Sequence, residues 1–359
     1  MREMFKRWAW RGYRDSTAQL HELRNLSWVA TRRCNLACVH CALSCDSAGS
    51  GGAELSTQEA KALFSSLAED FSPRRIGISV TGGEPLLRPD LFEVAAHINS
   101  LGFSWGLSTN GMLVNAHVLE LCSTTGLRAV SVSLDGPPEV HEALRGPGTY
   151  RPAVAAVEHF ARLGSIPLVE VAACLTPQLV QRLDMLYNLA GSLGVNRLRL
   201  MPVAPRGRAA GATQLRLSVS QMRAALDWLA YKRRNVTAHM QVVFDEAGYI
   251  GEPYEGVVRE GNFMCTAGIS GAAVLADGTV TGCAFLGSSF AQGNIREQPF
   301  SRIWDTGFKR LRDRRWMRRG PCAECQSFVE CGGGCLLQWT DAQAGGPCSC
   351  MAQDLRQQR

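Results

Sequence analysis

Between about residue 26 and residue 200, short apolar runs rich in β-branched residues alternate with longer segments of helical period. The short runs predict six strands, at residues 26–30, 76–80, 104–108, 129–134, 168–174 and 197–201. The longer segments predict helices at residues 57–69, 89–101, 116–124, 150–163, 179–193 and 220–232, with Ser56 and Ser220 as N-caps. Strands separated by helices are typical of parallel β/α units, so the pattern predicts an α/β fold with a partial (β/α)6 barrel.

The periodic pattern ends at residues 202–212, which are rich in Pro, Gly and Ala. We therefore expect four parts in the chain: an N-terminal extension at residues 1–25, the barrel at residues 26–212, a connecting helix and linker at residues 213–264, and a small cysteine-rich domain at residues 265–359. The last part has few long periodic segments. We expect bound metal to stabilise it, because its apolar core must be small.

With 359 residues, 46% of them hydrophobic, the chain can bury a substantial core. It contains no apolar run long enough for a membrane span, and its first residues lack the apolar segment of a signal peptide. These features predict a cytoplasmic protein with no membrane partner. Much of the net charge of +6 lies between Arg302 and Arg319. That stretch could bind an acidic peptide, but a solvated helix face is the expected explanation, and nucleic-acid binding is not expected.

The cysteines change this picture, because 14 of them in a long chain without an export signal indicate metal or redox chemistry. Cys34, Cys38 and Cys41 directly follow the first predicted strand, at the mouth of the barrel, where such folds hold their active sites. Three thiolates can hold three irons of a [4Fe-4S] cluster and leave the fourth iron open to a ligand. A zinc site completed by His40 or Cys45 is the alternative.

The spacing Cys34-x3-Cys38-x2-Cys41 resembles that of the radical S-adenosylmethionine (SAM) superfamily, and further motifs follow in that family's order. They are Thr-Gly-Gly-Glu-Pro at residues 81–85, Ser-Thr-Asn-Gly at 108–111 and Ser-Val-Ser-Leu-Asp-Gly at 131–136. The resemblance implies that a cluster on the three thiols cleaves SAM to a 5′-deoxyadenosyl radical. It also implies SAM contacts from His40, Gly82, Gly83, Glu84, Ser108, Asn110, Ser133, Arg145 and Met201.

The resemblance gives some of these residues specific roles, among them Met201, where the family's backbone meets the adenine. His40 would pack on the adenine, Glu84 would complement the methionine ammonium, and Arg145 would pair with the methionine carboxylate through its bidentate fork. The sequence assigns no catalytic acid or base.

A second group of eight cysteines lies between residues 265 and 350. A zinc ribbon using Cys322, Cys325, Cys331 and Cys335 is one interpretation, but it leaves four of the eight without a role. The whole pattern resembles the SPASM extension of radical SAM maturases, which carries two auxiliary [4Fe-4S] clusters. That resemblance implies an inner cluster on Cys265, Cys283 and Cys335 and an outer cluster on Cys322, Cys325, Cys331 and Cys348, with Cys350 as the alternative last ligand.

Two open points concern these clusters. Residues 258–264 contain no cysteine, whereas relatives with a fully ligated inner cluster have one there, so the inner cluster is expected to have an open iron unless Cys350 or a non-cysteine ligand closes it. Cys122 and Cys174 are expected to be buried apolar residues, and Cys45 has no assigned role. The expected cofactors are three [4Fe-4S] clusters and SAM.

Most SPASM enzymes modify ribosomally made peptides or proteins, so the resemblance implies oxidative modification, such as cross-linking, of a peptide or protein substrate. An external electron donor such as flavodoxin or ferredoxin is the expected partner. Ala284 follows Cys283, where the sulfatase-maturing branch typically has Asp, which argues against that activity. The alternatives are oxidation of a haem or tetrapyrrole side chain, whose propionates Arg206 and Arg208 could meet, and a non-catalytic zinc-binding module.

Overall fold

A computed structural model of the chain describes residues 2–45, 48, 53–235, 240–245, 248–286, 288–339, 347 and 350–357. In this part of the chain a single ten-stranded sheet has the order β10-β9-β8-β1-β2-β3-β4-β5-β6-β7. The six predicted strands are all present, as β1 (Asn25–Thr31), β2 (Gly77–Gly82), β3 (Ser104–Thr109), β4 (Leu127–Ser133), β5 (Leu168–Leu175) and β6 (Arg197–Pro202). They are parallel to one another, so the predicted α/β fold class is confirmed.

The remaining four strands were not predicted from the sequence. β7 (Gln241–Phe244) extends the parallel sheet beyond β6, and β8 (Gly271–Val274) pairs in parallel with the other edge, at β1. β9 (Thr279–Thr281) and β10 (Gly293–Asn294) continue from β8 in antiparallel pairing. The cysteine-rich part of the chain therefore continues the sheet of the barrel.

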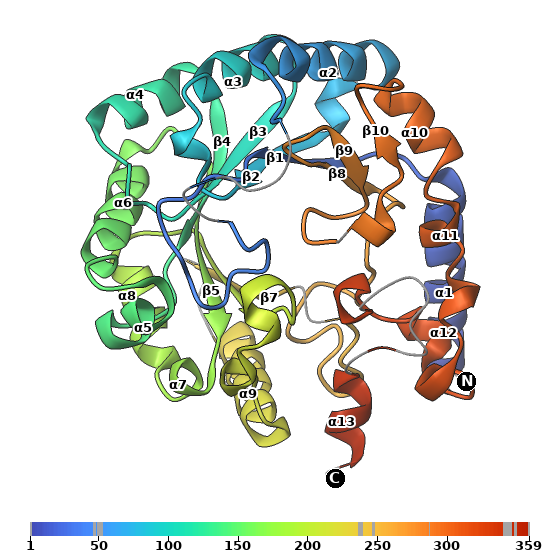
Figure 1. Cartoon of the computed structure of the whole chain (residues 1–359). Helices are drawn as coiled ribbons and strands as arrows, with labels where there is room; N and C mark the ends of the chain where they lie inside the picture. The colour runs from blue at the N-terminus through green and yellow to red at the C-terminus, as the bar shows by residue number, and fades with distance from the viewer. Residues whose placement is uncertain are drawn as a thin grey trace.

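Helices cover the outer face of the curved sheet, and the C-terminal part closes its remaining side (Figure 1). The covering helices are α2 (Thr57–Asp70), α3 (Leu91–Ser100), α4 (Ala116–Thr124), α5 (Pro138–Arg145), α6 (Tyr150–Leu163), α7 (Pro177–Val180), α8 (Leu183–Ser192) and α9 (Val219–Asn235). The C-terminal part adds the short helices α10 (Phe300–Thr306), α11 (Lys309–Arg312), α12 (Phe328–Cys331) and α13 (Met351–Gln357). The helix predicted at residues 179–193 is broken between α7 and α8, and α5 was not predicted.

Polar residues define the ends of two of these helices. Ser56 accepts a hydrogen bond from the Glu59 backbone, and the Glu59 side chain accepts one in return from the Ser56 backbone, so the predicted cap of α2 is confirmed as a capping box. The predicted cap Ser220 is wrong. It lies inside α9, and Ser218 instead accepts from the Gln221 backbone at 3.2 Å.

One apolar core joins the parts of the molecule. Trp28 of β1 packs edge-on against Phe64 of α2, with 5.6 Å between the ring centroids. The same continuous cluster of buried side chains includes Trp304 and Trp339 near the C-terminus. The division of the chain into four parts stays a prediction, because the sheet and the core both run across its last boundary.

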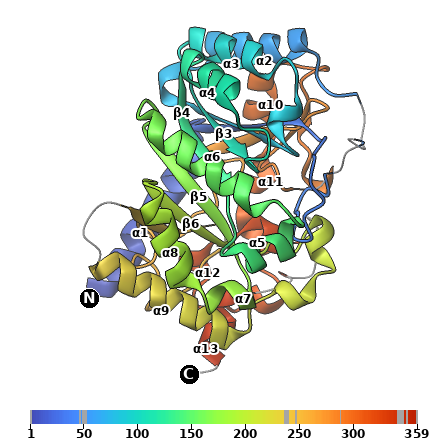
Figure 2. The same ribbon diagram turned by 90° about the vertical axis from the view of Figure 1, so that its left-hand side faces the viewer.

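The N-terminal extension is a helix, α1 (Arg2–Leu20), that lies against the C-terminal part (Figures 1 and 2). Trp10 Nε1 donates to the Glu330 carbonyl at 3.1 Å, and Trp304 Nε1 donates to the His21 carbonyl at 3.0 Å. Each bond joins residues from opposite ends of the sequence. Among the described residues, no helix combines the length and the apolar character needed to cross a membrane.

The basic stretch at residues 302–319 is only in part the solvated helix face that its charge predicted, because Lys309, Arg310, Arg315 and Arg318 are exposed but some of its other arginines are not. Helix α11 is only four residues long, and two arginines of the stretch turn inward to hydrogen-bond the backbone. Arg312 Nε donates to the Gly268 carbonyl at 2.9 Å, and Arg314 Nη2 donates to the Cys265 carbonyl at 2.9 Å. Arg315 is solvated as expected, with 91% of its side chain exposed.

Candidate functional site

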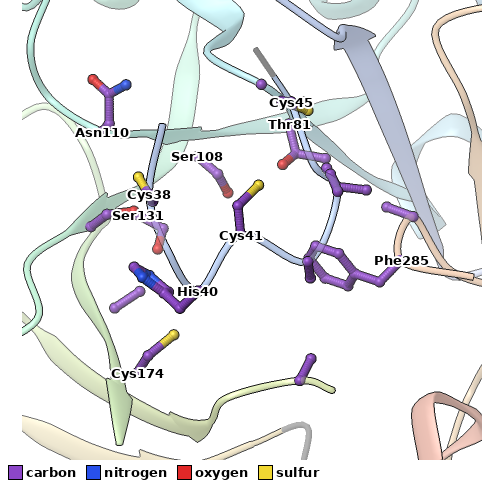
Figure 3. A pocket seen from close by; sticks show the side chains of 18 of the residues that line it. Cys38, His40, Cys41, Cys45, Thr81, Ser108, Asn110, Ser131, Cys174 and Phe285 are labelled. Atoms are coloured by element: carbon purple, nitrogen blue, oxygen red, sulfur yellow. The ribbon is translucent and has the colours of Figure 1, made fainter. Parts of the chain in front are cut away.

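A cavity of about 410 Å³ lies at the carboxyl ends of the parallel strands, where β/α folds hold their active sites (Figure 3). Residues from β1 to β6, from the cysteine loop after β1 and from the C-terminal part all line it. The lining includes eight of the predicted SAM contacts: His40, Gly82, Gly83, Ser108, Asn110, Ser133, Arg145 and Met201. It also includes Cys34, Cys38 and Cys41, so the structure brings together the residues that the motifs singled out.

The cysteine loop is fixed by contacts that the sequence analysis missed. Arg208 Nε donates to the Cys38 carbonyl at 2.8 Å, and its Nη1 donates to the Cys45 carbonyl at 2.7 Å. Gly207 has a φ of +57°, and a Cβ there would lie 2.5 Å from the Cys41 carbonyl oxygen. The sequence Arg-Gly-Arg at residues 206–208 was the available signal for this contact. Only glycine at the middle position allows this segment and the cysteine loop to approach so closely.

The three thiols lie close enough to influence one another. Burial raises the pKa of Cys34 and Cys38, and Cys41 adds to this rise at both positions. A hydrogen bond from Cys45 lowers the pKa of Cys41 to about 5, and the pKa of Cys45 itself rises as the donor of that bond. Thiolates are the form that binds iron, so a convergent set with one acidic member fits an iron–sulfur cluster.

Glu84 is the one predicted SAM contact that does not line the cavity. Its carboxylate is fully buried and accepts hydrogen bonds from the Asn110 backbone at 2.8 Å and from Thr109 Oγ1 at 2.8 Å. Burial raises its pKa to about 7 in spite of these donors. In this structure Glu84 fixes the end of β3, and the backbone of Gly82 and Gly83 forms the cavity wall.

Arg145 lines the cavity while paired with a buried partner that sequence reasoning did not assign. Its Nε donates to Asp135 Oδ2 at 2.5 Å, and Oδ1 of the same carboxylate accepts from the Cys174 backbone at 2.8 Å. Burial acts to raise the pKa of Asp135, but Arg145 and His40 outweigh it and hold that pKa at about 2. The guanidinium is therefore held in place, with Nη1 3.9 Å from Cys38 Sγ.

His40 is buried beside the same pair, with Nε2 3.7 Å from Asp135 Oδ2. Burial lowers the pKa of His40 to about 4, so the imidazole is neutral at physiological pH. A neutral ring at the cavity wall is compatible with the expected packing on adenine.

Cys174 corrects a prediction, because it lines the cavity instead of being buried in the core (Figure 3). The ligand atoms of His40, Asp135 and Cys174 lie within 4.8 Å of one another, which is the geometry of a candidate metal site. The Arg145 guanidinium is already paired with the Asp135 carboxylate, so a cation bound at this site would be repelled by a second positive charge. Cys122 is fully buried, as predicted.

The cysteines of the C-terminal part form two sets in space. A hydrogen bond from Cys335 strongly lowers the pKa of Cys265, and Cys283 adds to the raised pKa of Cys335. Cys283 also lines the central cavity together with Ala284 and Phe285. The three thiols expected for the inner cluster therefore converge, and one of them faces the predicted SAM site.

The second set contains Cys322, Cys325, Cys331 and Cys350. Burial raises the pKa of Cys331 to about 12, and the thiols of the other three residues contribute to the rise. Cys348, the expected last ligand, lies outside the described residues. The zinc-ribbon interpretation required Cys335 in this set, but Cys335 is hydrogen-bonded to Cys265.

Comparisons with known proteins agree with this geometry. The sequence matches the radical SAM superfamily over residues 28–187 and an iron–sulfur cluster-binding domain, SPASM, over residues 265–326. It is 30% identical to the mycofactocin maturase MftC of Mycobacterium ulcerans, over 87% of this chain and 82% of that protein. It is 29% identical to the AdoMet-dependent heme synthase of Methanosarcina barkeri, over 86% of this chain and 90% of that protein.

Solved structures show the same fold. The crystal structure of SuiB from Streptococcus suis bound to S-adenosylmethionine superposes with a TM-score of 0.72, covering 92% of this chain and 77% of that chain, at 16% identity. The strand-end cavity, the convergent thiols and the similarity along most of the sequence lead to one assignment: the chain is an enzyme of the radical SAM superfamily, in the group that carries a C-terminal SPASM iron–sulfur domain.

Proposed function

We propose that this enzyme cleaves SAM at a [4Fe-4S] cluster held by Cys34, Cys38 and Cys41 and oxidatively modifies a ribosomally made peptide or protein, for example by cross-linking. The similarity to mycofactocin maturases along 87% of the chain is the observation that carries the proposal. Cys283 at the wall of the central cavity supports it, because that position brings the C-terminal part to the place where the substrate must react.

Different residues of the cavity would bind different parts of the SAM molecule. When bound, the cluster would supply the electron that splits the sulfonium of SAM. Arg145 offers a fixed positive charge for the methionine carboxylate, since Asp135 holds the guanidinium in place. The backbones of Gly82 and Gly83 permit close approach of the ligand. Cys283, Ala284 and Phe285 of the C-terminal part line the cavity together with the strand ends and would limit the access of water to bound SAM.

We also propose two auxiliary [4Fe-4S] clusters, one on Cys265, Cys283 and Cys335 and one on the set that contains Cys350. The convergence of the thiols in each set supports the count of three clusters. The fourth position of the outer set is assigned to Cys350, which stands beside its other members. An external electron donor and a cytoplasmic location complete the proposal.

A second candidate is modification of a haem or tetrapyrrole side chain, which the similarity to AdoMet-dependent heme synthases favours. The arginines expected to meet propionates do not support it. Arg208 donates to the carbonyls of Cys38 and Cys45, and Arg206 Nη2 donates to the Trp339 carbonyl. Both side chains hold the backbone around the site.

The deciding experiment is anaerobic turnover of the iron-reconstituted enzyme with dithionite and SAM in the presence of alternative substrates. Short peptides encoded beside the gene and iron coproporphyrin III should be supplied separately. We expect one peptide to increase 5′-deoxyadenosine release and to change in mass. Modification of the porphyrin alone would replace the peptide proposal with the second candidate, and failure of the enzyme to take up iron during reconstitution, with zinc bound in its place, would contradict both.

A further inference from the structure

A second cavity, also of about 410 Å³, lies between α1 and the C-terminal part of the chain. We name it the basic groove. In Figure 1, α1 lies beside α11 and α12 at the edge of the molecule opposite α6 and α8. Arg14 Nη1 donates to the Val329 carbonyl at 2.5 Å, and Trp10 Nε1 donates to the Glu330 carbonyl at 3.1 Å. These two bonds fix α1 as one wall of the groove.

Arginines dominate the lining of the basic groove. The six arginines are Arg11, Arg14, Arg312, Arg314, Arg315 and Arg318, against two acidic residues, Asp15 and Asp313. Asp15 pairs with Arg11 at 3.5 Å, and Asp313 pairs with Arg315. The remaining positive charge is not balanced by acidic residues of the lining, so the groove favours an acidic partner.

The arginines of the groove fall into two kinds. Arg312 and Arg314 donate to backbone carbonyls and shape its floor. Arg11 and Arg315 have 61% and 91% of their side chains exposed, and Arg318 is exposed as well, although its Nε also donates to the Ala323 carbonyl at 3.1 Å. The exposed arginines lie where an incoming protein surface would meet them.

Cysteines from both C-terminal sets line the groove. They are Cys265, of the inner set, and Cys331, of the outer set. Among the described residues, the basic groove shares no lining residue with the central cavity. A substrate must reach the central cavity, whereas an electron carrier needs only to approach a cluster. The position of the groove therefore favours an electron carrier over a substrate peptide.

We propose that the basic groove docks a small acidic electron-transfer protein, of the flavodoxin or ferredoxin type, beside the auxiliary clusters. This inference rests on the proposed function, since it requires iron–sulfur clusters at Cys265 and Cys331. The exchange is a single electron transfer: the carrier loses one electron, the cluster gains it, and no bond or proton moves. Charge complementarity steers such encounters and makes them sensitive to salt.

The test is direct binding of the carrier to the reconstituted enzyme, measured by fluorescence anisotropy at low and at high salt. Labelled flavodoxin and labelled [2Fe-2S] ferredoxin serve as separate probes. The double variant Arg11→Glu/Arg315→Glu reverses charge at two exposed positions of the groove. The matched control is Arg151→Glu/Arg162→Glu on α6, where Arg162 is 72% exposed and pairs with Glu158 as Arg315 pairs with Asp313.

We expect the groove variant to bind at least one carrier at least about tenfold more weakly than the wild type, and the α6 variant to bind normally. Iron content and thermal midpoint, measured for both variants, show that clusters and fold are retained. Equal binding by the groove variant and the wild type would overturn the proposal. So would binding of neither carrier by the wild type, or binding of a polyglutamate peptide in the groove without either carrier.

The same experiment separates this inference from the proposed function. Dithionite delivers electrons without a protein carrier, so SAM cleavage by the wild type with dithionite tests the enzyme alone. Cleavage with dithionite but no carrier binding would reject the docking site and leave the function standing. Absence of cleavage together with carrier binding would reject the function.

Discussion

The barrel and the cysteine-rich part of this enzyme are built from different interactions. The barrel, from β1 to β6, rests on parallel strand pairing and on fully buried apolar side chains such as Trp28 and Trp105. In the described residues after β10 the chain forms short helices and turns, and arginines hold the backbone there, as Arg314 holds the Cys265 and Gly334 carbonyls. The packing of the barrel alone can position a site, whereas the structure of the cysteine-rich part depends more on the groups that its thiols bind.

The largest expected effect tests whether SAM cleavage belongs to the barrel. Substituting Ala for Cys34, Cys38 and Cys41 together should reduce 5′-deoxyadenosine release to the level without enzyme, because the proposed cluster loses every protein ligand. The thermal midpoint should change little, since the apolar core of the barrel is intact. Cys122→Ala, at a buried cysteine outside all three sets, is the control for general loss of a thiol. Full cleavage by the triple variant would contradict the assignment.

Cysteine-to-alanine substitutions in the cysteine-rich part should instead destabilise that part and leave SAM cleavage intact. Replacing Cys322, Cys325 and Cys331 with Ala should lower the iron content and loosen the C-terminal part, while SAM cleavage with dithionite persists. Hydrogen exchange would show faster exchange after β10 and unchanged protection in β1 to β6. Uniform exchange throughout the chain would show that the two regions are not held differently.

Buried ion pairs provide a further comparison. Asp135→Asn leaves Arg145 without its charged partner at 2.5 Å and should cost about 3–5 kcal/mol of unfolding free energy. In the linker that precedes the cysteine-rich part, the Arg259 to Glu255 pair is longer, at 3.9 Å, and Glu255 also accepts from the Ile250 and Phe263 backbones. Glu255→Gln should therefore cost less. Denaturant unfolding of both variants measures the difference, and equal costs would contradict it.

The arginines that hold carbonyls should have intermediate effects. Arg314→Met removes the donors to the Cys265 and Gly334 carbonyls and should cost about 1–3 kcal/mol, because two partly buried acceptors lose their partner. Iron at the inner set should fall while SAM cleavage with dithionite continues. Arg315→Met, at an exposed neighbour that makes no such bond to a carbonyl, is the matched control. Equal stability of the two variants would show that the carbonyl contacts do not matter.

The smallest effect concerns a contact between the two regions. Arg296 donates to Glu59 at 2.6 Å, and this bond together with the Ser56 cap lowers the pKa of Glu59 to about 2. Because that pKa is lower in the folded than in the unfolded chain, the stabilisation is complete above about pH 4.5 and is lost as the pH falls towards 2. Arg296→Met should weaken this dependence in acid unfolding. Ser56→Ala should cost about 1 kcal/mol.

Sequence reasoning predicted the barrel well because its signals are local. Each parallel strand is a short apolar run, and the cap at Ser56 lies three residues from its partner Glu59. The three-cysteine spacing and the strand-end motifs are also local, so they predicted eight SAM contacts and three cysteines that do line the central cavity. The inward-facing position of Cys174 was missed, although Glu170 lies on the same face of its strand four residues earlier and marks that face as polar.

The features that sequence reasoning missed depend on contacts between distant residues. β8 is four residues long and is defined by pairing with β1. The role of Arg208 depends on the fold that brings it to the cysteine loop. The role of Asp135 likewise depends on its contact with Arg145. The basic stretch misled for the same reason, since its sequence does not show that Arg312 and Arg314 meet carbonyls from other segments.

The pairing of β8 with β1 has a consequence for how the molecule folds. Asn25 pairs with Gly271, so one edge of β1 stays without a partner while the intervening chain is synthesised. An unpaired strand edge is a template for association with other chains, and contacts between distant residues form slowly. We expect the newly made barrel to be most prone to aggregation before β8 docks, and a truncated chain ending before Gly271 to expose that edge permanently.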